Sequence, residues 1–503
     1  MNHSPMVITL SWLACAAIVI VLLTGCSVNG KPMRFNPQTS SKSRSWYIEG
    51  KATNGSPFSC SFVEFDERGD FIDFLQHKDC ELVISNLVNS GPVLLLLYCH
   101  GWKNNSQSGD VTEFNSFLER LAGSEEIRSK GLRVHGVYLG WRGNAFMPYV
   151  NTNSDNQCYQ DTLKAYGEPI VDPSYRRFSY WIGAVPETLS YWSRKRAAEH
   201  LVSGLPMARA IFTYASAAKQ YGAALTNRVC VMGHSFGALM LEKSLGQAMT
   251  GELTMEWWNN KEKVKALHKA SIPFDLILFV NSAAPSIYAK EMRDFLEAYR
   301  NALRLNHNPD QDVPVIVSLT STADWATGVV HPIGNCLAPF APSLQRRYTT
   351  GIFGTPTDHV YPMHPGIPQY KFYTKTPGHQ PYLVNHWIVK DTNAPMPADK
   401  SSAALFSTNL SLSIPEKDRD LFFTSKAKHS AAAWRIVTNN PGTAVTLQGM
   451  PLSMQDSDYW IMSCGGELIS GHNDVWSVTT MEMYAGIFRA VEARRKRLAG
   501  ERD

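Results

Sequence analysis

The sequence has none of the cysteine and histidine spacings that mark a metal site. Its nine cysteines include no C-x-x-C pair, and its fifteen histidines include no H-E-x-x-H arrangement. Such spacings bring two ligands together on one turn or one face of a helix. We therefore expect no bound metal.

A large charge of one sign is also missing. The 503 residues carry 48 Lys and Arg against 44 Asp and Glu, and no basic run is interleaved with aromatic residues. Surfaces that bind nucleic acid usually show both features, so we expect no nucleic-acid partner. The length suits one α/β domain that is enlarged by insertions.

An apolar run extends from residue 6 to 23 and leads into Leu-Thr-Gly-Cys26. This ending resembles a bacterial lipobox, in which a signal peptidase cuts before the cysteine and the thiol carries diacylglycerol. Ser27, rather than an aspartate, follows Cys26, which resembles lipoproteins of the outer membrane. We expect residues 1–25 to be a lipoprotein signal peptide and residues 26–55 a flexible tether. The body would then lie at the bacterial cell envelope, lipid-anchored to the outer membrane and facing the periplasm.

The N-terminus has no Lys or Arg ahead of this apolar run, whereas secretory signals usually begin with positive charge. The alternative is an uncleaved N-terminal membrane anchor, because the run is just long enough to span a bilayer. Four basic residues would then hold the body on the cytoplasmic side by the positive-inside rule. They are Lys31, Arg34, Lys42 and Arg44.

The most informative motif is the pentapeptide Gly233-His-Ser-Phe-Gly237. It lies between an apolar run at 228–232, which predicts a strand, and residues 238–249, which predict a helix. In this context Gly-x-Ser-x-Gly places Ser235 on a sharp, strained turn with its Oγ exposed, and the glycines remove Cβ atoms that would clash. The motif therefore predicts Ser235 as a nucleophile.

A second apolar run, residues 92–99, predicts a parallel strand that ends in His100-Gly-Trp102. We expect the backbone N–H groups of Trp102 and Phe236 to form an oxyanion hole beside the serine. For the His100 side chain we favour a structural role, in which the ring fixes the loop by hydrogen bonds, over a catalytic one.

Asp324 follows a predicted strand at 314–320, itself preceded by another at 274–280. A carboxylate beyond the end of such a strand lies at the edge where open α/β sheets build their sites. It could orient a catalytic base. The alternative is a helix N-cap or turn residue.

His472 lies after the last predicted strand, 458–464, and before a closing helix at 478–494. The order Ser235, Asp324, His472 is the order found in α/β-hydrolases. Other histidines also follow the aspartate and are rival bases, although none follows a clear strand: His331, His359, His364, His379 and His386.

Four motifs together resemble a bacterial and fungal esterase-like group of the α/β-hydrolase superfamily. They are His-Gly-Trp at 100–102, Gly-Trp-Arg-Gly at 140–143, Gly-His-Ser-x-Gly at 233–237 and Asp-Trp-Ala-Thr at 324–327. The resemblance covers residues 56–335 and 458–497. It implies an α/β-hydrolase fold, with a mostly parallel central sheet and helices on both faces, and a serine esterase or lipase-like activity without a cofactor. It does not specify the substrate.

Two segments interrupt the expected core. Residues 144–190 are rich in aromatics and predict a lid or binding wall, or alternatively a cover over the sheet edge. Residues 328–457 are rich in Pro and His and predict a cap with short strands, such as 370–374 and 444–447. The core then comprises residues 56–143, residues 191–327 with the nucleophile and acid, and residues 458–503 with the closing strand, the His472 loop and the C-terminal helix.

The cysteines bear on the compartment. Cys60 and Cys80 flank a predicted hairpin, in which residues 59–65 pair with 71–75, and could be bridged in an oxidising periplasm. Cys99 and Cys230 lie in apolar strands and are expected to be reduced core residues.

Two functions from different classes fit these observations. The first is a serine hydrolase that cleaves carboxylic esters, small-molecule or lipid, through an acyl-enzyme. The second is a catalytically silent, hydrolase-like lipoprotein that binds a partner. The presence of Ser235, Asp324 and His472 in the expected order favours the enzyme.

Overall fold

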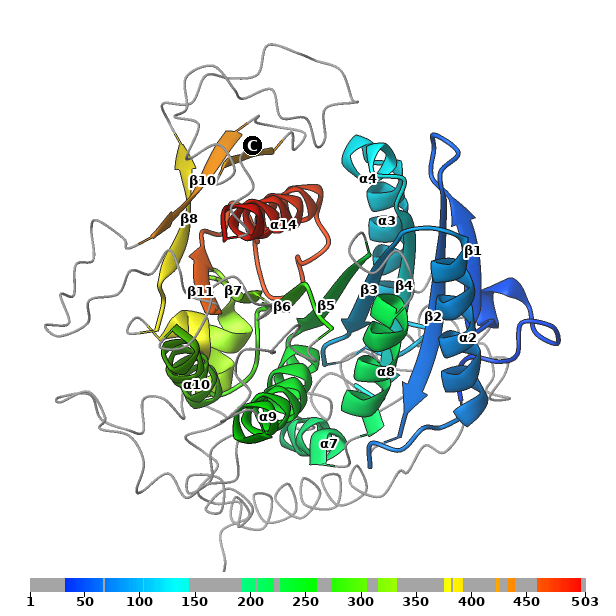
Figure 1. Ribbon diagram of the computed structural model, residues 1–503, viewed down its shortest axis with the longest axis horizontal. Helices are drawn as coiled ribbons and strands as arrows, with labels where there is room; N and C mark the ends of the chain where they lie inside the picture. The colour runs from blue at the N-terminus through cyan, green and yellow to red at the C-terminus, as the bar shows by residue number, and fades with distance from the viewer. Residues whose placement is uncertain are drawn as a thin grey trace, which may run out of the picture.

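A single mostly parallel β-sheet with helices on both faces forms the core of the protein in the computed structural model (Figure 1). The structure describes residues 32–66, 68–102, 104–143, 191–203, 206–220, 227–259, 273–304, 315–332, 375–380, 383–391, 422–425, 432–438 and 459–498.

The strands follow the order β1-β2-β4-β3-β5-β6-β7-β11-β8-β10-β9 across the sheet. Neighbours from β2 to β8 run parallel, while β1 at one edge and β10 and β9 at the other pair antiparallel. The bounds are β1 Tyr47–Lys51, β2 Pro57–Phe65, β3 Val93–Cys99, β4 Arg133–Trp141, β5 Arg228–His234, β6 Leu276–Val280, β7 Val315–Ser321, β8 His386–Asp391, β9 Phe422–Ser425, β10 Ala432–Thr438 and β11 Tyr459–Cys464.

Three strands of the central sheet are buried along their whole length. Every residue of β3, β6 and β11 is buried, as expected for parallel strands that are covered on both faces. Their nearly continuous apolar sequence follows from this burial, because neither face meets water. The strands that we predicted at 92–99, 228–232, 274–280, 314–320 and 458–464 are confirmed, with ends that differ by a few residues.

Each face of the sheet carries its own hydrophobic layer. Helices α2 (Phe74–Ser90), α7 (Tyr191–Ser203), α8 (Pro206–Gln220), α9 (Phe236–Asn259) and α10 (Ser286–Arg304) contribute side chains to one layer. Helices α3 (Gly109–Gly123), α4 (Glu125–Ser129) and α14 (Val478–Leu498) contribute to the other. Figure 1 shows α9 and α14 on opposite sides of β5 and β6. The class of the fold is therefore α/β.

The segment that we expected to be a flexible tether, residues 26–55, is packed against the sheet from residue 32 onward. Strand β1 forms its edge, and Arg34 is buried with its Nε donating to the carbonyl of Ser106. The backbone N–H of Arg34 also donates to the buried carboxyl of Glu64 at 3.0 Å. A buried carboxyl requires such donors, and Glu64 recruits them from this segment.

The expected hairpin of residues 59–65 with 71–75 forms only at its turn, where Phe65 and Phe71 make an isolated antiparallel bridge. Strand β2 pairs with β1 and β4, and residues from Phe74 onward form helix α2. Asp73 explains the difference, because its side chain accepts a hydrogen bond from the N–H of Leu75 at 2.9 Å and caps the helix.

Cys60 and Cys80 are free, buried thiols rather than a disulfide. Cys60 belongs to the hydrophobic layer on one face of the sheet and Cys80 to the layer on the other, so the backbone of the sheet separates them. Burial raises the pKa of the Cys60 thiol to about 12 and also raises that of Cys80. Neither residue therefore reports on the redox state of the compartment.

The described part of residues 328–457 extends the central sheet instead of folding as a separate cap. Strand β8 lies parallel beside β11, and β10 and β9 continue from it. The Asn385 side chain joins this region to β11, since it accepts from the N–H of Ile461 and donates to the carbonyl of Tyr459. The predicted strands 370–374 and 444–447, and the segment 144–190, lie outside the described residues.

In the ranges that the structure describes, no helix combines the length and the apolar character needed to cross a bilayer.

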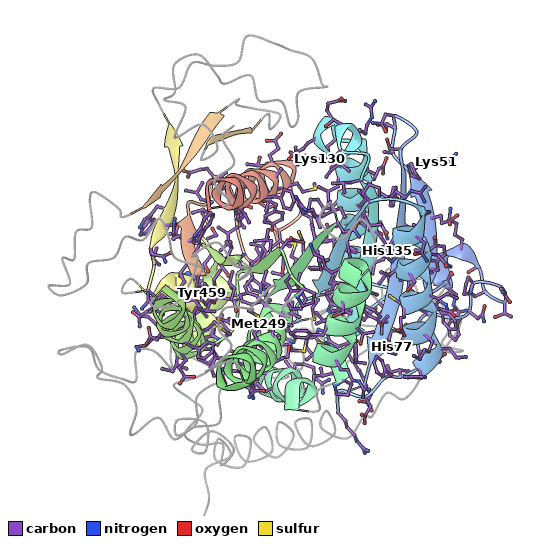
Figure 2. The ribbon with its side chains drawn as sticks, viewed as in Figure 1. Lys51, His77, Lys130, His135, Met249 and Tyr459 are labelled. Atoms are coloured by element: carbon purple, nitrogen blue, oxygen red, sulfur yellow. The ribbon has the colours of Figure 1, made fainter. Side chains whose placement is uncertain are left out.

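Two buried histidines form hydrogen bonds in the interior of the fold: His77 on α2 and His135 on β4 (Figure 2). The Nδ1 atom of His77 lies 2.6 Å from the Tyr214 hydroxyl, and that of His135 lies 2.8 Å from Ser59 Oγ. Burial lowers the pKa of both rings, so we assign them a structural role.

Helix α9 carries a buried carboxyl, Glu242, which is 2 % exposed. It accepts hydrogen bonds from Ser282 Oγ at 3.0 Å and from the Tyr459 hydroxyl at 2.9 Å, and burial raises its pKa to about 7. In the unfolded chain a glutamate ionises near about 4.3. The folded state therefore holds this proton more tightly, and its contribution to stability is complete below the unfolded pKa and is lost as the pH rises toward 7.

We predict that the wild type loses about 2 kcal/mol of unfolding free energy relative to Glu242→Gln between pH 5 and pH 8. The glutamine stays neutral at both values, so the difference isolates the ionisation of one carboxyl. Urea unfolding at the two pH values measures it, with Glu125→Gln on the surface of α4 as the control. Parallel pH dependence in the wild type and Glu242→Gln would contradict the prediction.

Candidate active site

The three residues that we predicted as nucleophile, acid and base meet at the carboxyl edge of the sheet. Ser235 follows β5 directly, Asp324 follows β7, and His472 lies in the loop between β11 and α14. Strands β5, β6, β7 and β11 are consecutive parallel neighbours, so their carboxyl ends lie along one edge.

The turn at Ser235 has the strained conformation that its sequence indicates. Ser235 has a φ of 56°, which is unusual for a residue with a side chain. Its N–H donates to the carbonyl of Val280, and its own carbonyl accepts from the N–H of Ala283. These bonds to the end of β6 hold the residue in a conformation that costs about 1 to 3 kcal/mol.

The two motif glycines permit this turn by close approach. A Cβ at Gly237 would lie 2.2 Å from the carbonyl oxygen of Cys99 and 2.5 Å from that of His100. A Cβ at Gly233 would lie 2.7 Å from the Cα of Ala238. Helix α9 can therefore start against the end of β3 only without side chains at these positions.

Gly237→Ala should destabilise the fold by about 2 kcal/mol or more, because the methyl group meets rigid backbone rather than a movable side chain. Chemical unfolding measures the loss. Gly471→Ala, in the loop of the histidine, is the matched control, since a Cβ there meets nothing within 4 Å. Equal stability of the two variants would contradict the prediction, because it would show that the backbone at the end of β3 can move to accommodate the methyl group.

A continuous hydrogen-bond chain links the three side chains. Ser235 Oγ lies 2.8 Å from Nε2 of His472, and Nδ1 of His472 lies 3.0 Å from each carboxylate oxygen of Asp324. With Nδ1–H donating to the carboxylate, Nε2 is left as an acceptor for the serine proton. The serine is more enclosed than we expected, since it is 3 % exposed.

Asp324 is buried yet ionised. Burial by itself raises the pKa of a carboxyl, but the hydrogen bond and charge of His472, together with donors from Thr327, lower the pKa of Asp324 below its usual value. The N–H of Thr327 lies 3.1 Å from Oδ1, and its hydroxyl donates to Oδ2. Asp324 thus acts as a turn cap and as the partner of His472 at once, so the two interpretations of this residue are compatible.

The loop 100–102 lies directly against the nucleophile. A Cβ at Gly101 would lie 2.8 Å from the Cβ of Ser235, so the backbone before Trp102 touches the serine turn. Phe236, on the other side of Ser235, is the first residue of α9, where backbone N–H groups have no partner within the helix. The rings of Trp102 and Phe236 are 6.1 Å apart, and both contact Tyr191 of α7.

His100 has the structural role that we favoured. The N–H of Trp141 donates to its Nε2 at 3.1 Å, so Nδ1 carries the proton and donates to the carbonyl of Gly101 at 2.9 Å. Its ring stacks on that of Trp141 with centroids 5.6 Å apart. Burial lowers the pKa of His100 to about 4. The neutral ring fixes the loop beside the serine.

The rival histidines that the structure describes make other contacts. His331 pairs with the Tyr191 hydroxyl, His379 with Thr376 Oγ1, and His386 with Asn385. His359 and His364 lie outside the described residues. Among the histidines that the structure does describe, His472 is the one that bonds to Ser235 Oγ.

Arg142, which we considered as a ligand for an acidic group, follows β4 and lines a small cavity of about 20 Å³ with Glu64 and Ser106. Its carbonyl accepts from Arg194 of α7 at 3.4 Å. Over the described ranges, no group of three or more His, Cys, Asp or Glu residues is arranged to hold a metal ion.

Two residues of the site, His234 and Asn281, were not predicted from the sequence. Both donate a side-chain N–H to the main-chain carbonyl of His472. His234 lies inside the pentapeptide and Asn281 follows β6 directly, but nothing in their spacing indicates a contact with a loop about two hundred residues away.

A search against protein-family models, curated proteins and solved structures finds no match for this chain. The function proposed below therefore depends on the geometry of Ser235, His472 and Asp324.

Proposed function

We propose that the protein is a serine hydrolase of the α/β-hydrolase type, which cleaves carboxylic esters, small-molecule or lipid, through an acyl-enzyme. The observation that carries this proposal is the hydrogen-bond chain from Ser235 Oγ through His472 to the Asp324 carboxylate, at the carboxyl edge of a parallel sheet. No dissociable cofactor is needed, because the nucleophile and the base belong to the chain. Residues 144–190 would provide the lid over the site.

In the first half of the reaction, Ser235 Oγ attacks the carbonyl carbon of the ester while its proton moves to Nε2 of His472. The Asp324 carboxylate holds Nδ1–H, so it orients the ring and stabilises the imidazolium that forms. The tetrahedral intermediate then collapses. His472 gives its proton to the departing alcohol, and the acyl group stays on the serine.

In the second half, water attacks the acyl carbon and gives a proton to Nε2 of His472. The second tetrahedral intermediate expels Ser235 Oγ, which recovers the proton, and the carboxylic acid leaves. In both halves the backbone N–H groups of Trp102 and Phe236 would bind the oxyanion, each donor contributing about 3 to 4 kcal/mol. The contact of Gly101 with Ser235 supports this assignment.

Labelling with a fluorophosphonate tests the proposal directly, because the reagent phosphonylates a serine only when a base activates it. The wild type should be labelled on the peptide that contains Ser235, and Ser235→Ala should not. Absence of both labelling and acyl-ester hydrolysis in the wild type would favour the catalytically silent binding module.

For the location, we propose a lipoprotein held at the bacterial outer membrane through Cys26, with the body in the periplasm. The apolar run and the Leu-Thr-Gly-Cys26 ending support this assignment. The packed segment begins near Met33, which is buried, so the distance between the lipid and the folded body would be short. An uncleaved N-terminal anchor is the alternative.

Cys26→Ala should block both lipid attachment and cleavage. Several acyl chains anchor stably because each buried methylene contributes about 0.8 kcal/mol. Mass spectrometry of the mature N-terminus reads the outcome, and Cys15→Ala, inside the apolar run, is the control. An intact Met1 with unmodified Cys26 would establish the uncleaved anchor instead.

A further inference from the structure

We propose that His234 and Asn281 are positioning residues, which hold the catalytic ring of His472 in place through that residue's own main-chain carbonyl. This inference rests on the proposed function, since it assigns a catalytic purpose to the placement of His472.

His234 contributes the shorter of the two bonds. Its Nε2 lies 2.8 Å from the carbonyl oxygen of His472, and because a carbonyl only accepts, Nε2 carries the proton. Its Nδ1 is buried and has no hydrogen-bond partner among the residues that the structure describes. The two imidazole rings lie 4.9 Å apart, centroid to centroid. Among the described residues, the ring of His234 therefore makes one hydrogen bond, to the loop that carries His472.

The neutral state of His234 is suited to this position. Burial, and then the neighbouring His472, lower the pKa of His234 to about 3. A neutral ring keeps its Nε2–H donor and adds no positive charge beside His472, where an imidazolium forms during catalysis. A cation at this place would oppose that proton transfer.

Asn281 contributes the second bond and connects the loop to the acid. Its Nδ2 donates to the same carbonyl at 3.3 Å, while its Oδ1 accepts from the N–H of Ser321 at 3.0 Å. Ser321 ends β7, and Asp324 follows three positions later. Asn281 has a φ of 45°, in the left-handed region that asparagine adopts more readily than most other residues.

The loop needs such support because of its composition. Residues 465–474 contain three glycines, and a rotation of the peptide at His472 would swing the ring away from Ser235. Ser321 Oγ provides a further anchor, since it donates to the carbonyl of Ile469 at 2.6 Å. A displacement of about 1 Å in a catalytic group can cost about 100-fold in rate.

The test compares two replacements of one residue. His234→Phe keeps a planar ring but has no N–H, whereas His234→Gln keeps an amide donor at the reach of Nε2. We expect kcat for an acyl ester to fall about 10- to 100-fold in His234→Phe with KM nearly unchanged, and to stay within about fivefold in His234→Gln. His77→Phe, the same change at a buried histidine far from the site, should lower stability and leave kcat unchanged.

Asn281→Asp supplies an independent arm. The aspartate keeps the acceptor for the N–H of Ser321 and tolerates positive φ, but it presents an oxygen to the His472 carbonyl. It should therefore lower kcat in the way that His234→Phe does. Unchanged kcat in both His234→Phe and Asn281→Asp, with a folded protein, would overturn the inference.

Hydrogen–deuterium exchange of the peptide that covers residues 465–474 separates this inference from the proposed function. Exchange there should be faster in His234→Phe and Asn281→Asp than in the wild type and His234→Gln, whether or not the protein hydrolyses esters. A wild type without activity but with this pattern would overturn the proposed function, while the role of His234 and Asn281 in holding the His472 loop would stand. Equal exchange in all four proteins would overturn that role.

Discussion

Ser235→Ala should abolish ester hydrolysis, with kcat reduced on the order of 10³ to 10⁶-fold and the fold retained. The substitution removes the oxygen that forms the acyl-enzyme in the proposed mechanism. The loss in stability should be small, because the β-carbon stays in place and, among the described residues, the hydroxyl bonds only to Nε2 of His472. Steady-state kinetics on a short acyl ester, with thermal unfolding alongside, measures both quantities.

Ser244→Ala is the matched control for this prediction. Ser244 is also a buried serine, on the helix α9 that follows Ser235, and its Oγ donates to the carbonyl of Leu241 at 3.5 Å. Its replacement should leave kcat within about twofold, as expected of a substitution outside the site. Full activity in Ser235→Ala would remove the nucleophile from the proposed mechanism.

His472→Ala should be as severe as the serine substitution. In the proposed mechanism Nε2 accepts the Ser235 proton, and no other described histidine bonds to that oxygen. Residues that act as one unit are not additive. The double variant Ser235→Ala, His472→Ala should therefore be slower than either single variant by no more than about tenfold. Single-turnover kinetics with an activated ester gives the comparison.

The histidines of the segment 328–457 provide the controls for this second prediction. His359→Ala, His364→Ala and His379→Ala should each keep kcat within about tenfold of the wild type, as expected of residues that take no proton in the reaction. Substantial activity in His472→Ala together with its loss in one of these three variants would transfer the base to that histidine.

Much of the central sheet could be predicted from the sequence, because parallel strands covered on both faces must be apolar without interruption. Strands β3, β5 and β7 are visible in this way. The predictions from sequence were wrong where a single side chain determines the local structure. Asp73 caps a helix where a strand was predicted, and the buried Glu64 accepts hydrogen bonds from a segment that was predicted to be a flexible tether. Neither interaction alters the hydrophobic pattern.

The region after β7 shows a second limit. Residues 328–457 were predicted to form a cap because they are rich in Pro and His, but their strand β8, which was not predicted, joins the central sheet next to β11. The Asn385 side chain bonds to the backbone of β11 on both sides of Trp460. A strand's neighbours in a sheet are chosen by such contacts between distant segments, which leave no periodic signal in either segment.

By itself the sequence determined the apolar strands, the sharp turn around Ser235 and the three residue types suited to nucleophile, acid and base. These features depend on local sterics and on continuous burial, which neighbouring residues are sufficient to encode. Only the tertiary structure decided that His472, rather than His331 or His379, reaches Ser235 Oγ, across 237 positions of the chain. The same holds for the two donors on the His472 carbonyl, because contacts between separate strand ends exist only once the sheet has aligned them.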